Sequence, residues 1–399
     1  MSAEQTMEFR TLDQLSLSGK RVFIRVDFNV PLDKETGQTI RSDTRIRMAL
    51  PTVQAVLERG ASVVLASHLG RPKGIPNAKM SLAPVAKRLA ELLQRPVGLA
   101  PDCIGPETAS MARALCPGEL LLLENLRFHA GEEANDPAFA RELALLADVY
   151  VNDAFGAAHR AHASTAGVAE LLEQHSAGLL MQRELEYLSM ATSAPRHPYV
   201  AIIGGAKISG KIDVIRNLLT LADKVLIGGA MTYTFLKAKG FGTGASLLED
   251  GRVELASDLL AEAGERLVLP VDHVIADGFS VDAAMQTVIG AVPDGWMGVD
   301  IGPETIATYE SIIGDAALIV WNGPMGVFEL EPFAKGTIAI ARAVERASAN
   351  SISIVGGGDS ERAIRVAGVG RNITHISTGG GASLEFLGGQ VLPGVAALG

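Results

Sequence analysis

The stretch YVAIIGGAKISGK, residues 199–211, decides the fold because it joins an apolar run to a glycine-rich turn. Its first five residues show no apolar–polar alternation, which is typical of a strand buried on both faces of a sheet. Eight further runs of this kind each end in a polar or glycine-rich turn. They are RVFIRVDFNVP (21–31), SVVLASHLGRP (62–72), LLLLENLRFH (120–129), DVYVNDAFGAAHRAH (148–162), KVLIGGAM (224–231), ALIVWNGPMGVFE (317–329), ISIVGGGDS (352–360) and HISTGGGAS (375–383).

Amphipathic stretches lie between these runs. Leu82, Val85, Leu89 and Leu92 share one face of a helix that we expect Ser81 to cap. Strands that alternate with helices indicate parallel α/β units with right-handed crossovers. Ligands in such sheets bind beyond the carboxyl ends of the strands, where the turns quoted above are expected to lie.

Length and composition exclude several classes of protein. A chain of 399 residues suggests two domains, and LLMQRELEYLSMA (179–191) is expected to link them. Hydrophobic residues make up 48%, which excludes general disorder, yet no apolar run approaches the roughly 18 residues of a membrane helix. The polar start MSAEQTMEFR does not resemble a secretory signal, and the net charge of −10 argues against a protein that coats nucleic acid. Cys103 and Cys116 form no CxxC pair, so neither a disulfide scaffold nor a thiolate zinc site is indicated. We therefore expect a soluble cytosolic protein.

The turns of the first half carry basic residues, and those of the second half carry glycines. If the sheet brings the basic side chains to one edge, they form a positive basket for a small anionic metabolite, since arginine matches phosphate and carboxylate bidentately. Asp27 and Asn29 could hold hydroxyl groups beside it. The alternative is that each arginine is a solvated surface charge. The basic residues are Arg45, His68, Arg71, Arg127, His129, His159, Arg160 and His162.

Two other kinds of site are weighed against an anion site. A metal site at His159 and His162 is disfavoured, because Arg160 lies between them and few carboxylates accompany them. The segment from Gly205 to Lys211 matches GxxxxGK, but Ile212 follows where a P-loop needs Ser or Thr to bind magnesium.

The glycine clusters of the second half favour a nucleotide site. The turn GGAKISGK places glycine N–H groups, with Lys207 and Lys211, at a helix start that could bind phosphate. In GGGDS, Asp359 offers a hard oxygen ligand for Mg²⁺ and Ser360 a hydroxyl. GGGAS (379–383) has the same design without the acid. No stretch fits GxGxxG, which disfavours a dinucleotide dehydrogenase.

These motifs, taken together, resemble those of the phosphoglycerate kinase family over essentially the whole chain. The resemblance rests on RVDFNVP, SHLGRP, ENLRFH, YVNDAFGAAHRAH, GGAKISGK, GWMGVDIGP (295–303), WNGPMGVFE, GGGDS and STGGGASLE with LPGVAAL, in family order and spacing. It implies reversible, Mg²⁺-dependent phosphoryl transfer from 1,3-bisphosphoglycerate to ADP in glycolysis. It also implies two Rossmann-like three-layer α/β/α domains with parallel sheets, joined by a hinge.

The resemblance also implies which residues act. Residues 1–176 would form the phosphoglycerate domain, with 388–399 packing back onto it, and 177–387 the nucleotide domain. Arg45, Lys211, Gly379 and Gly380 would be catalytic, and Asp359 would hold the metal. Phosphoglycerate would bind at Asp27, Phe28, Asn29, Arg45, His68, Leu69, Gly70, Arg71, Arg127 and Arg160. The nucleotide would bind at Lys207, Lys211, Gly298, Val299, Asn322, Glu329, Gly356, Gly357, Gly358, Asp359 and Ser360.

Two departures from the family pattern are mild. Ala230 stands where many relatives have glycine, which adds a methyl group near the base pocket, and Ser360 stands where many have threonine. The expected partners are phosphoglycerate and ATP or ADP, with neither nucleic acid nor membrane, and the expected state is a monomer. Two alternatives remain open: an enzyme acting on another phosphorylated acid, and a non-catalytic binding protein on the same fold.

Overall fold

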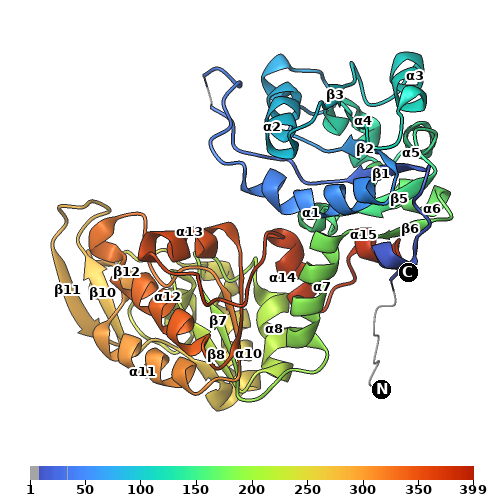
Figure 1. Ribbon diagram of the computed structural model, residues 1–399. Helices are drawn as coiled ribbons and strands as arrows, with labels where there is room; N and C mark the ends of the chain where they lie inside the picture. The colour runs from blue at the N-terminus through green and yellow to red at the C-terminus, as the bar shows by residue number, and fades with distance from the viewer. Residues whose placement is uncertain (1–8, 34) are drawn as a thin grey trace. The chain divides into compact units, whose positions relative to one another are not determined.

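The computed structural model describes residues 9–33 and 35–399, which divide into two compact units. The first unit comprises the described residues up to Glu186 together with Val391–Gly399, and the second is Tyr187–Gln390. The division falls inside helix α7 (Leu179–Thr192), in the green part of the chain in Figure 1. Within the described residues, no helix is long and apolar enough to cross a lipid bilayer.

The first unit is built on a six-stranded parallel sheet of order β3-β4-β2-β1-β5-β6. Its strands β1, β2 and β5 are buried almost throughout, so helices must cover both faces, as Figure 1 shows. The strands are β1 (Arg21–Arg25), β2 (Ser62–Ala66), β3 (Gly98–Leu99), β4 (Leu120–Leu122), β5 (Val149–Asn152) and β6 (His175–Ala177). The helices are α1 (Thr44–Glu58), α2 (Ala83–Leu93), α3 (Pro106–Ala114), α4 (Ala130–Glu133), α5 (Pro137–Ala144), α6 (Val168–Leu171) and α15 (Pro393–Ala396).

The end of the chain belongs to the first unit. The Asn152 amide, at the end of β5, donates to the Gly394 carbonyl at 3.0 Å, and the Gly394 N–H donates to the Ala158 carbonyl at 2.8 Å. Both Leu392 and Val395 are buried. The red helix α15 therefore packs among blue and green elements in Figure 1.

The second unit has a second six-stranded parallel sheet, of order β15-β14-β13-β7-β8-β9. Every residue of the central strands β7 and β13 is buried. The strands are β7 (Tyr199–Ile203), β8 (Lys224–Ile227), β9 (Leu267–Val268), β13 (Leu318–Asn322), β14 (Ile352–Gly356) and β15 (His375–Ile376). The helices are α8 (Ile212–Leu221), α9 (Met231–Ala238), α10 (Val253–Ala263), α11 (Pro303–Gly314), α12 (Lys335–Ala347), α13 (Gly358–Ala367) and α14 (Gly381–Leu387).

A separate antiparallel sheet, which the sequence did not predict, also belongs to the second unit. Its strands β10 (Asp272–Ala276), β11 (Met285–Ile289) and β12 (Met297–Ile301) pair in the order β11-β10-β12. Strand β11 is mostly exposed, so it lacks a buried apolar run of the kind that predicted β1, β2, β7 and β13.

The expected α/β/α architecture is confirmed, with one local correction. Helix α2 begins at Ala83, and Ser81 is not its N-cap. The Ser81 hydroxyl accepts from the Ala83 N–H at 3.1 Å and donates to Glu124 at 2.6 Å, so it ties the helix start to the loop after β4.

Candidate active site

Three loops of the first unit meet at the carboxyl end of its sheet. The loop after β1 bonds to the loop after β2, because the Asn29 side chain accepts from the Gly70 N–H at 2.9 Å. The loop after β4 joins them, since the Asn125 carboxamide oxygen accepts from Leu69 N–H and its NH₂ group donates to the Leu69 carbonyl. Arg127 donates to the Gly70 carbonyl at 2.9 Å. The structure therefore brings the expected residues of these loops together.

Asp27 forms the anionic member of this edge. Its carboxylate accepts a hydrogen bond from the Arg45 guanidinium, at the start of α1, at 2.6 Å. Burial raises the pKa of Asp27, but nearby basic groups, including Arg45 and Arg25, and the Asn29 N–H outweigh it and lower the pKa below its usual value. Asp27 is therefore an ionised acceptor that can take a hydrogen bond from a ligand hydroxyl.

His68 supplies hydrogen bonding without positive charge. The ring is buried, and burial, with the charges of Arg25 and Arg127, lowers its pKa well below the usual value. Its Nδ1 lies 3.2 Å from an Arg25 nitrogen. This corrects the expectation of a cationic histidine, and the positive charge of the edge comes from its arginines.

A buried network beneath this edge was missed by sequence reasoning. Arg25 is fully buried at the end of β1 and donates to the Ser164 hydroxyl at 2.7 Å. That hydroxyl donates to Glu132 at 2.6 Å, and the Ser164 N–H donates to the same carboxylate at 3.0 Å. Arg25 lies inside an apolar run, so the sequence marks it only as a strand residue. Nothing in the sequence shows that its side chain joins a buried network.

The remaining arginines of the expected set differ in exposure. Arg127 is buried and forms an ion pair with Glu133 at 3.1 Å. Burial and the nearby charge of Arg160 lower the pKa of Arg127. The two guanidinium groups are therefore close enough to interact electrostatically. Arg160 and Arg71 are exposed. Phe28 and Leu69 are buried, and Phe28 N–H donates to the Ser67 hydroxyl at 2.8 Å, so both position backbone.

Lys211 is the central group of the second unit. It precedes α8, and its ammonium donates to the Gly204 carbonyl at 2.6 Å and to the Asn322 Oδ1 at 2.6 Å. Burial lowers the pKa of Lys211 to about 8, against the opposing charge of Asp359. Its charge is thus held at the carboxyl ends of β7 and β13. Lys207 is exposed in the same turn.

The loop after β14 lies beside this lysine. The Asn322 amide donates to the Gly356 carbonyl at 2.9 Å, and the Ser360 hydroxyl accepts from Gly323 N–H at 2.7 Å. Gly357 adopts φ +93°, which a side chain would strain, and its position lets α13 start with free N–H groups.

A pocket of about 460 Å³ opens next to these loops. Its walls are mostly apolar, and the expected residues Gly298, Val299, Glu329 and Asp359 all line it. Ala230 lines it as well, so the methyl group noted in the sequence faces this space. A mostly apolar cavity of this size with a few polar groups suits a planar base.

Three further lining residues were not predicted from the sequence, and they come from helix α9 and from strands β10 and β12. They are Tyr233, His273 and Asp300. Burial raises the pKa of Asp300 to about 7, although N–H groups of Gly336 and Ile301 bond to its carboxylate. The Tyr233 ring packs against the His273 ring at 5.5 Å between centroids.

Comparison with known proteins identifies the family. The family model described as phosphoglycerate kinase matches residues 12–390. The chain belongs to the phosphoglycerate kinase family. It is 60% identical to the phosphoglycerate kinase of Solibacter usitatus, over 98% of this chain and all of that one, and 58% identical to that of Moorella thermoacetica, over 97% and 98%. It is similar to the solved phosphoglycerate kinase of Coxiella burnetii, with a TM-score of 0.89 and 42% identity over 98% of this chain and 99% of that one.

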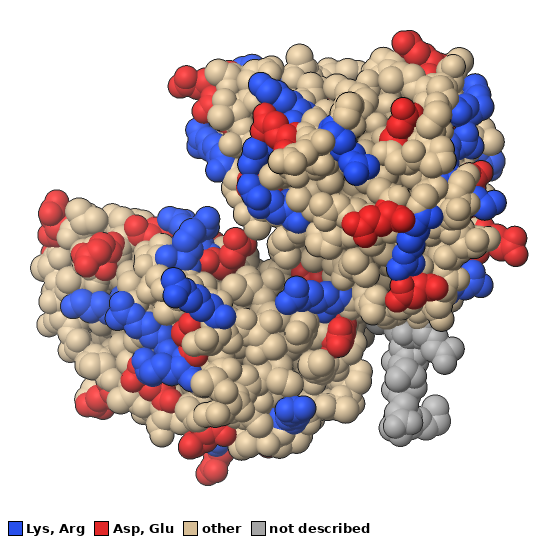
Figure 2. Space-filling view, viewed as in Figure 1, with Lys and Arg blue, Asp and Glu red and all other residues tan. Residues whose placement is uncertain are grey.

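Membership of the phosphoglycerate kinase family gives the activity. The protein is a phosphotransferase with a carboxyl group as acceptor, and it interconverts 1,3-bisphosphoglycerate and ADP with 3-phosphoglycerate and ATP in glycolysis. Basic and acidic side chains are interspersed on the face of each unit shown in Figure 2.

Gly379 and Gly380 occupy the turn between β15 and α14. Gly380 adopts φ +55°, and the Gly379 N–H donates to the Ser377 hydroxyl at 3.2 Å. Helix α14 has only seven residues. Any contribution of its N-terminal N–H groups to binding a phosphoryl group therefore depends on the conformation of this turn.

Asp359 is the residue that fits a phosphoglycerate kinase magnesium ion. Its carboxylate is exposed at the pocket and near enough to Lys211 to oppose its pKa shift. Mg²⁺ in phosphoryl-transfer sites is held by one or two carboxylates together with substrate phosphates, so a single exposed carboxylate here is a suitable donor set.

Proposed function

We propose that the first unit binds phosphoglycerate and the second binds the nucleotide, with Lys211 and Arg45 acting on the phosphoryl group that moves. The observation that carries this division is the half-buried Lys211 ammonium, anchored at the sheet edge beside the nucleotide-sized pocket. No comparable pocket is needed in the first unit, because a small anion requires charge more than apolar walls.

The arginines of the first unit would bind the phosphate and carboxylate of phosphoglycerate. The charges of Arg127 and Arg160 interact with each other, and Arg71 is exposed in the loop after β2. Arg45 donates a hydrogen bond to Asp27. Guanidinium forks match both anions bidentately. Asp27 and Asn29 would receive or direct the substrate hydroxyl. His68, Leu69, Gly70 and Phe28 would hold these loops in register.

The nucleotide would lie along the pocket of the second unit. The base would occupy the apolar part near Gly298 and Val299, and the ribose hydroxyls would bond to Glu329. The phosphates would meet the backbone of Gly356, Gly357 and Gly358, where the uncapped start of α13 offers N–H groups, together with Lys207. Asn322 and Ser360 support this arrangement by fixing Lys211 and the β13–β14 loops.

The chemistry needs no general base. A carboxylate oxygen of 3-phosphoglycerate, already ionised, attacks the γ-phosphorus of ATP, and the bond from that phosphorus to the β–γ bridging oxygen breaks, leaving ADP. Catalysis then comes from in-line positioning and charge stabilisation, which the Lys211 ammonium, the Arg45 guanidinium and the Gly379–Gly380 turn would supply. Mg²⁺ held by Asp359 would neutralise charge on the nucleotide phosphates.

The two substrates belong to different units, so transfer requires them to be brought together. We therefore propose hinge closure favoured by both ligands, which also excludes the water that would otherwise accept the phosphoryl group. Small-angle scattering with neither, one or both ligands tests this, and an unchanged radius of gyration with both present contradicts it. We also propose that the enzyme is cytoplasmic and monomeric. Analytical sedimentation tests the monomeric state.

Activity is tested by mixing the protein with ATP, Mg²⁺ and 3-phosphoglycerate and coupling the product to NADH oxidation. We expect turnover that requires all three. Lys211→Ala and Arg45→Ala should each lower kcat about 10²–10³-fold while the fold is kept. Near-normal kcat in either variant removes that residue from the role. Turnover with another phosphorylated acid in place of 3-phosphoglycerate, but not with it, would favour the alternative substrate.

A further inference from the structure

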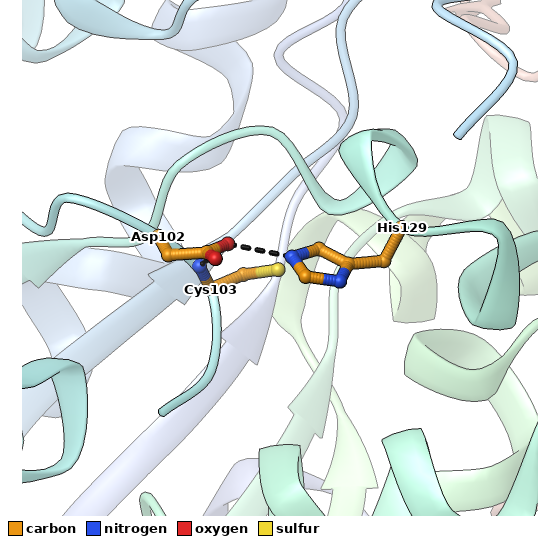
Figure 3. Close-up of side chains that lie close together, drawn as sticks. All are labelled: Asp102, Cys103 and His129. Atoms are coloured by element: carbon orange, nitrogen blue, oxygen red, sulfur yellow. Dashed lines mark hydrogen bonds and ion pairs between the residues drawn. The ribbon is translucent and has the colours of Figure 1, made fainter. Parts of the chain in front are cut away.

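A carboxylate, a thiol and an imidazole meet in the first unit, and the phosphoryl-transfer mechanism uses none of them. Asp102 and Cys103 lie in the turn between β3 and α3, and His129 directly precedes α4. One ligand atom from each lies within 4.8 Å of the other two. Figure 3 shows the Cys103 thiol and the His129 ring pointing toward one another beside the Asp102 carboxylate.

The three side chains are held in place by their surroundings. The Asp102 carboxylate accepts from the Cys103 N–H at 2.6 Å and lies 2.7 Å from the His129 Nε2. The Thr108 hydroxyl donates to the Asp102 carbonyl at 3.1 Å, which fixes the turn. The His129 ring stacks on Phe139 at 5.2 Å between centroids, and Cys103 is fully buried. The cluster is therefore largely arranged before any ligand arrives.

We propose that Asp102, Cys103 and His129 form a Zn²⁺ site that is separate from the Mg²⁺ of the reaction. Thiolate, imidazole and carboxylate are the three ligand types that Zn²⁺ takes in proteins, whereas Mg²⁺ prefers an all-oxygen shell. Tetrahedral ligands at about 2.0–2.3 Å from zinc lie about 3.4 Å apart. The Asp102–His129 pair must open by less than about 1 Å to reach that spacing, and water completes the fourth position.

Zinc binding must release a proton at this site. Cysteine binds zinc as the thiolate, so the thiol proton of Cys103 must leave when the metal binds. When the Zn–S bond forms, that proton goes to solvent. The His129 Nε2, which lies 2.7 Å from the Asp102 carboxylate, exchanges that hydrogen bond for a bond to zinc, and the metal-bound imidazole then carries its proton on Nδ1.

The ion would tie two segments that are distant in sequence. It joins the β3–α3 turn to the segment two residues beyond Arg127, so its binding should stabilise the first unit. The ligands come from separate turns and only one is a cysteine. Because no CxxC pair marks this site, it could not be recognised as a thiolate zinc site from the sequence.

The test titrates metal-stripped, reduced full-length protein with ZnCl₂ in the presence of excess Mg²⁺. We expect one Zn²⁺ per chain, release of protons to a weak buffer, and a higher thermal midpoint. Replacing Zn²⁺ by Co²⁺ should give a thiolate-to-cobalt charge-transfer band. Cys103→Ser should abolish that band, and His129→Gln should weaken zinc binding at least about 100-fold, beyond the 10–100-fold typical of losing a group that only orients a ligand.

The exposed Cys116 provides the matched control. Cys116→Ser should bind Zn²⁺ as the parent protein does. If Cys103→Ser does not fold by circular dichroism, His129→Gln and Asp102→Asn decide, because both side chains are partly exposed. The proposal is overturned if the parent protein binds no stoichiometric Zn²⁺. It is equally overturned if binding survives in His129→Gln and Asp102→Asn, or is lost in Cys116→Ser.

Discussion

Replacing Lys211 by methionine should separate the activity of this protein from its stability. The side chain keeps its length and loses its charge. Burial lowers the pKa of Lys211 from 10.5 to about 8, and each pKa unit is about 1.4 kcal/mol, so holding the ammonium charged in the folded protein at neutral pH costs about 3 kcal/mol. The methionine removes that cost but leaves the Gly204 carbonyl and Asn322 Oδ1 without this donor, at about 1–3 kcal/mol each. These opposing terms predict a variant about as stable as the parent at pH 7, with kcat lowered about 10²–10³-fold.

The pH dependence of stability isolates the lysine. Below pH 8 the Lys211 amine is protonated in both the folded and the unfolded protein. The full cost of burying its charge then lowers the free energy of unfolding. As pH rises through 8 the folded state loses its proton first, while the unfolded state keeps it until 10.5, so the free energy of unfolding rises with pH. Between pH 7 and pH 10 the parent protein should gain about 2.5 kcal/mol relative to Lys211→Met.

Urea denaturation followed by tryptophan fluorescence measures the free energy of unfolding of the second unit, to which Lys211 belongs. Both tryptophans, Trp296 and Trp321, belong to the second unit, and Trp321 is fully buried. Other groups titrate in both proteins and cancel in the comparison. Lys207→Met, which removes an exposed lysine from the same turn, should follow the parent curve. Parallel curves for the parent and Lys211→Met from pH 7 to 10 would refute the reasoning.

Three further outcomes follow from contacts described above. Arg127→Lys keeps the charge but loses the planar fork on the Gly70 carbonyl, so steady-state kinetics should show KM for 3-phosphoglycerate raised at least about tenfold with KM for ATP unchanged. A methyl group on Gly298 would lie 1.6 Å from the Tyr233 hydroxyl oxygen, so Gly298→Ala should lower the free energy of unfolding by about 1–3 kcal/mol in urea, and Tyr233→Phe should recover part of it in a double-mutant cycle. His68 carries no charge at neutral pH, so His68→Gln should change KM for 3-phosphoglycerate by less than about tenfold; a loss as large as that of Arg127→Lys would mean that the ring is charged.

The buried strands were predictable because burial on both faces leaves a mark in the sequence itself. RVFIR, YVAII and LIVWN form β1, β7 and β13. The loops that follow them were predictable as site loops, since parallel strands place their carboxyl ends at one edge. Strand β11 was not predictable, because it is mostly exposed and pairs only with β10.

The part of the site that escaped prediction consists of buried polar groups. Nothing adjacent to Arg25 in sequence shows that Ser164 and Glu132 will receive it, because these partners come from distant segments. The loss of charge on His68 has the same origin, since the burial that lowers its pKa is a property of the packed loops. Asp300 acquires its raised pKa only when β12 is enclosed.

The placement of α15 in the first unit has a consequence for the order in which the chain folds during synthesis. The ribosome completes the six strands of the first sheet by Ala177, yet the Gly394 groups that bond to Asn152 and Ala158 are made only after the entire second unit. The nascent first unit therefore waits for more than 200 residues with that surface uncovered. A segment made after the second unit thus completes the first unit, so termination before that segment would damage a unit whose sheet had already been synthesised.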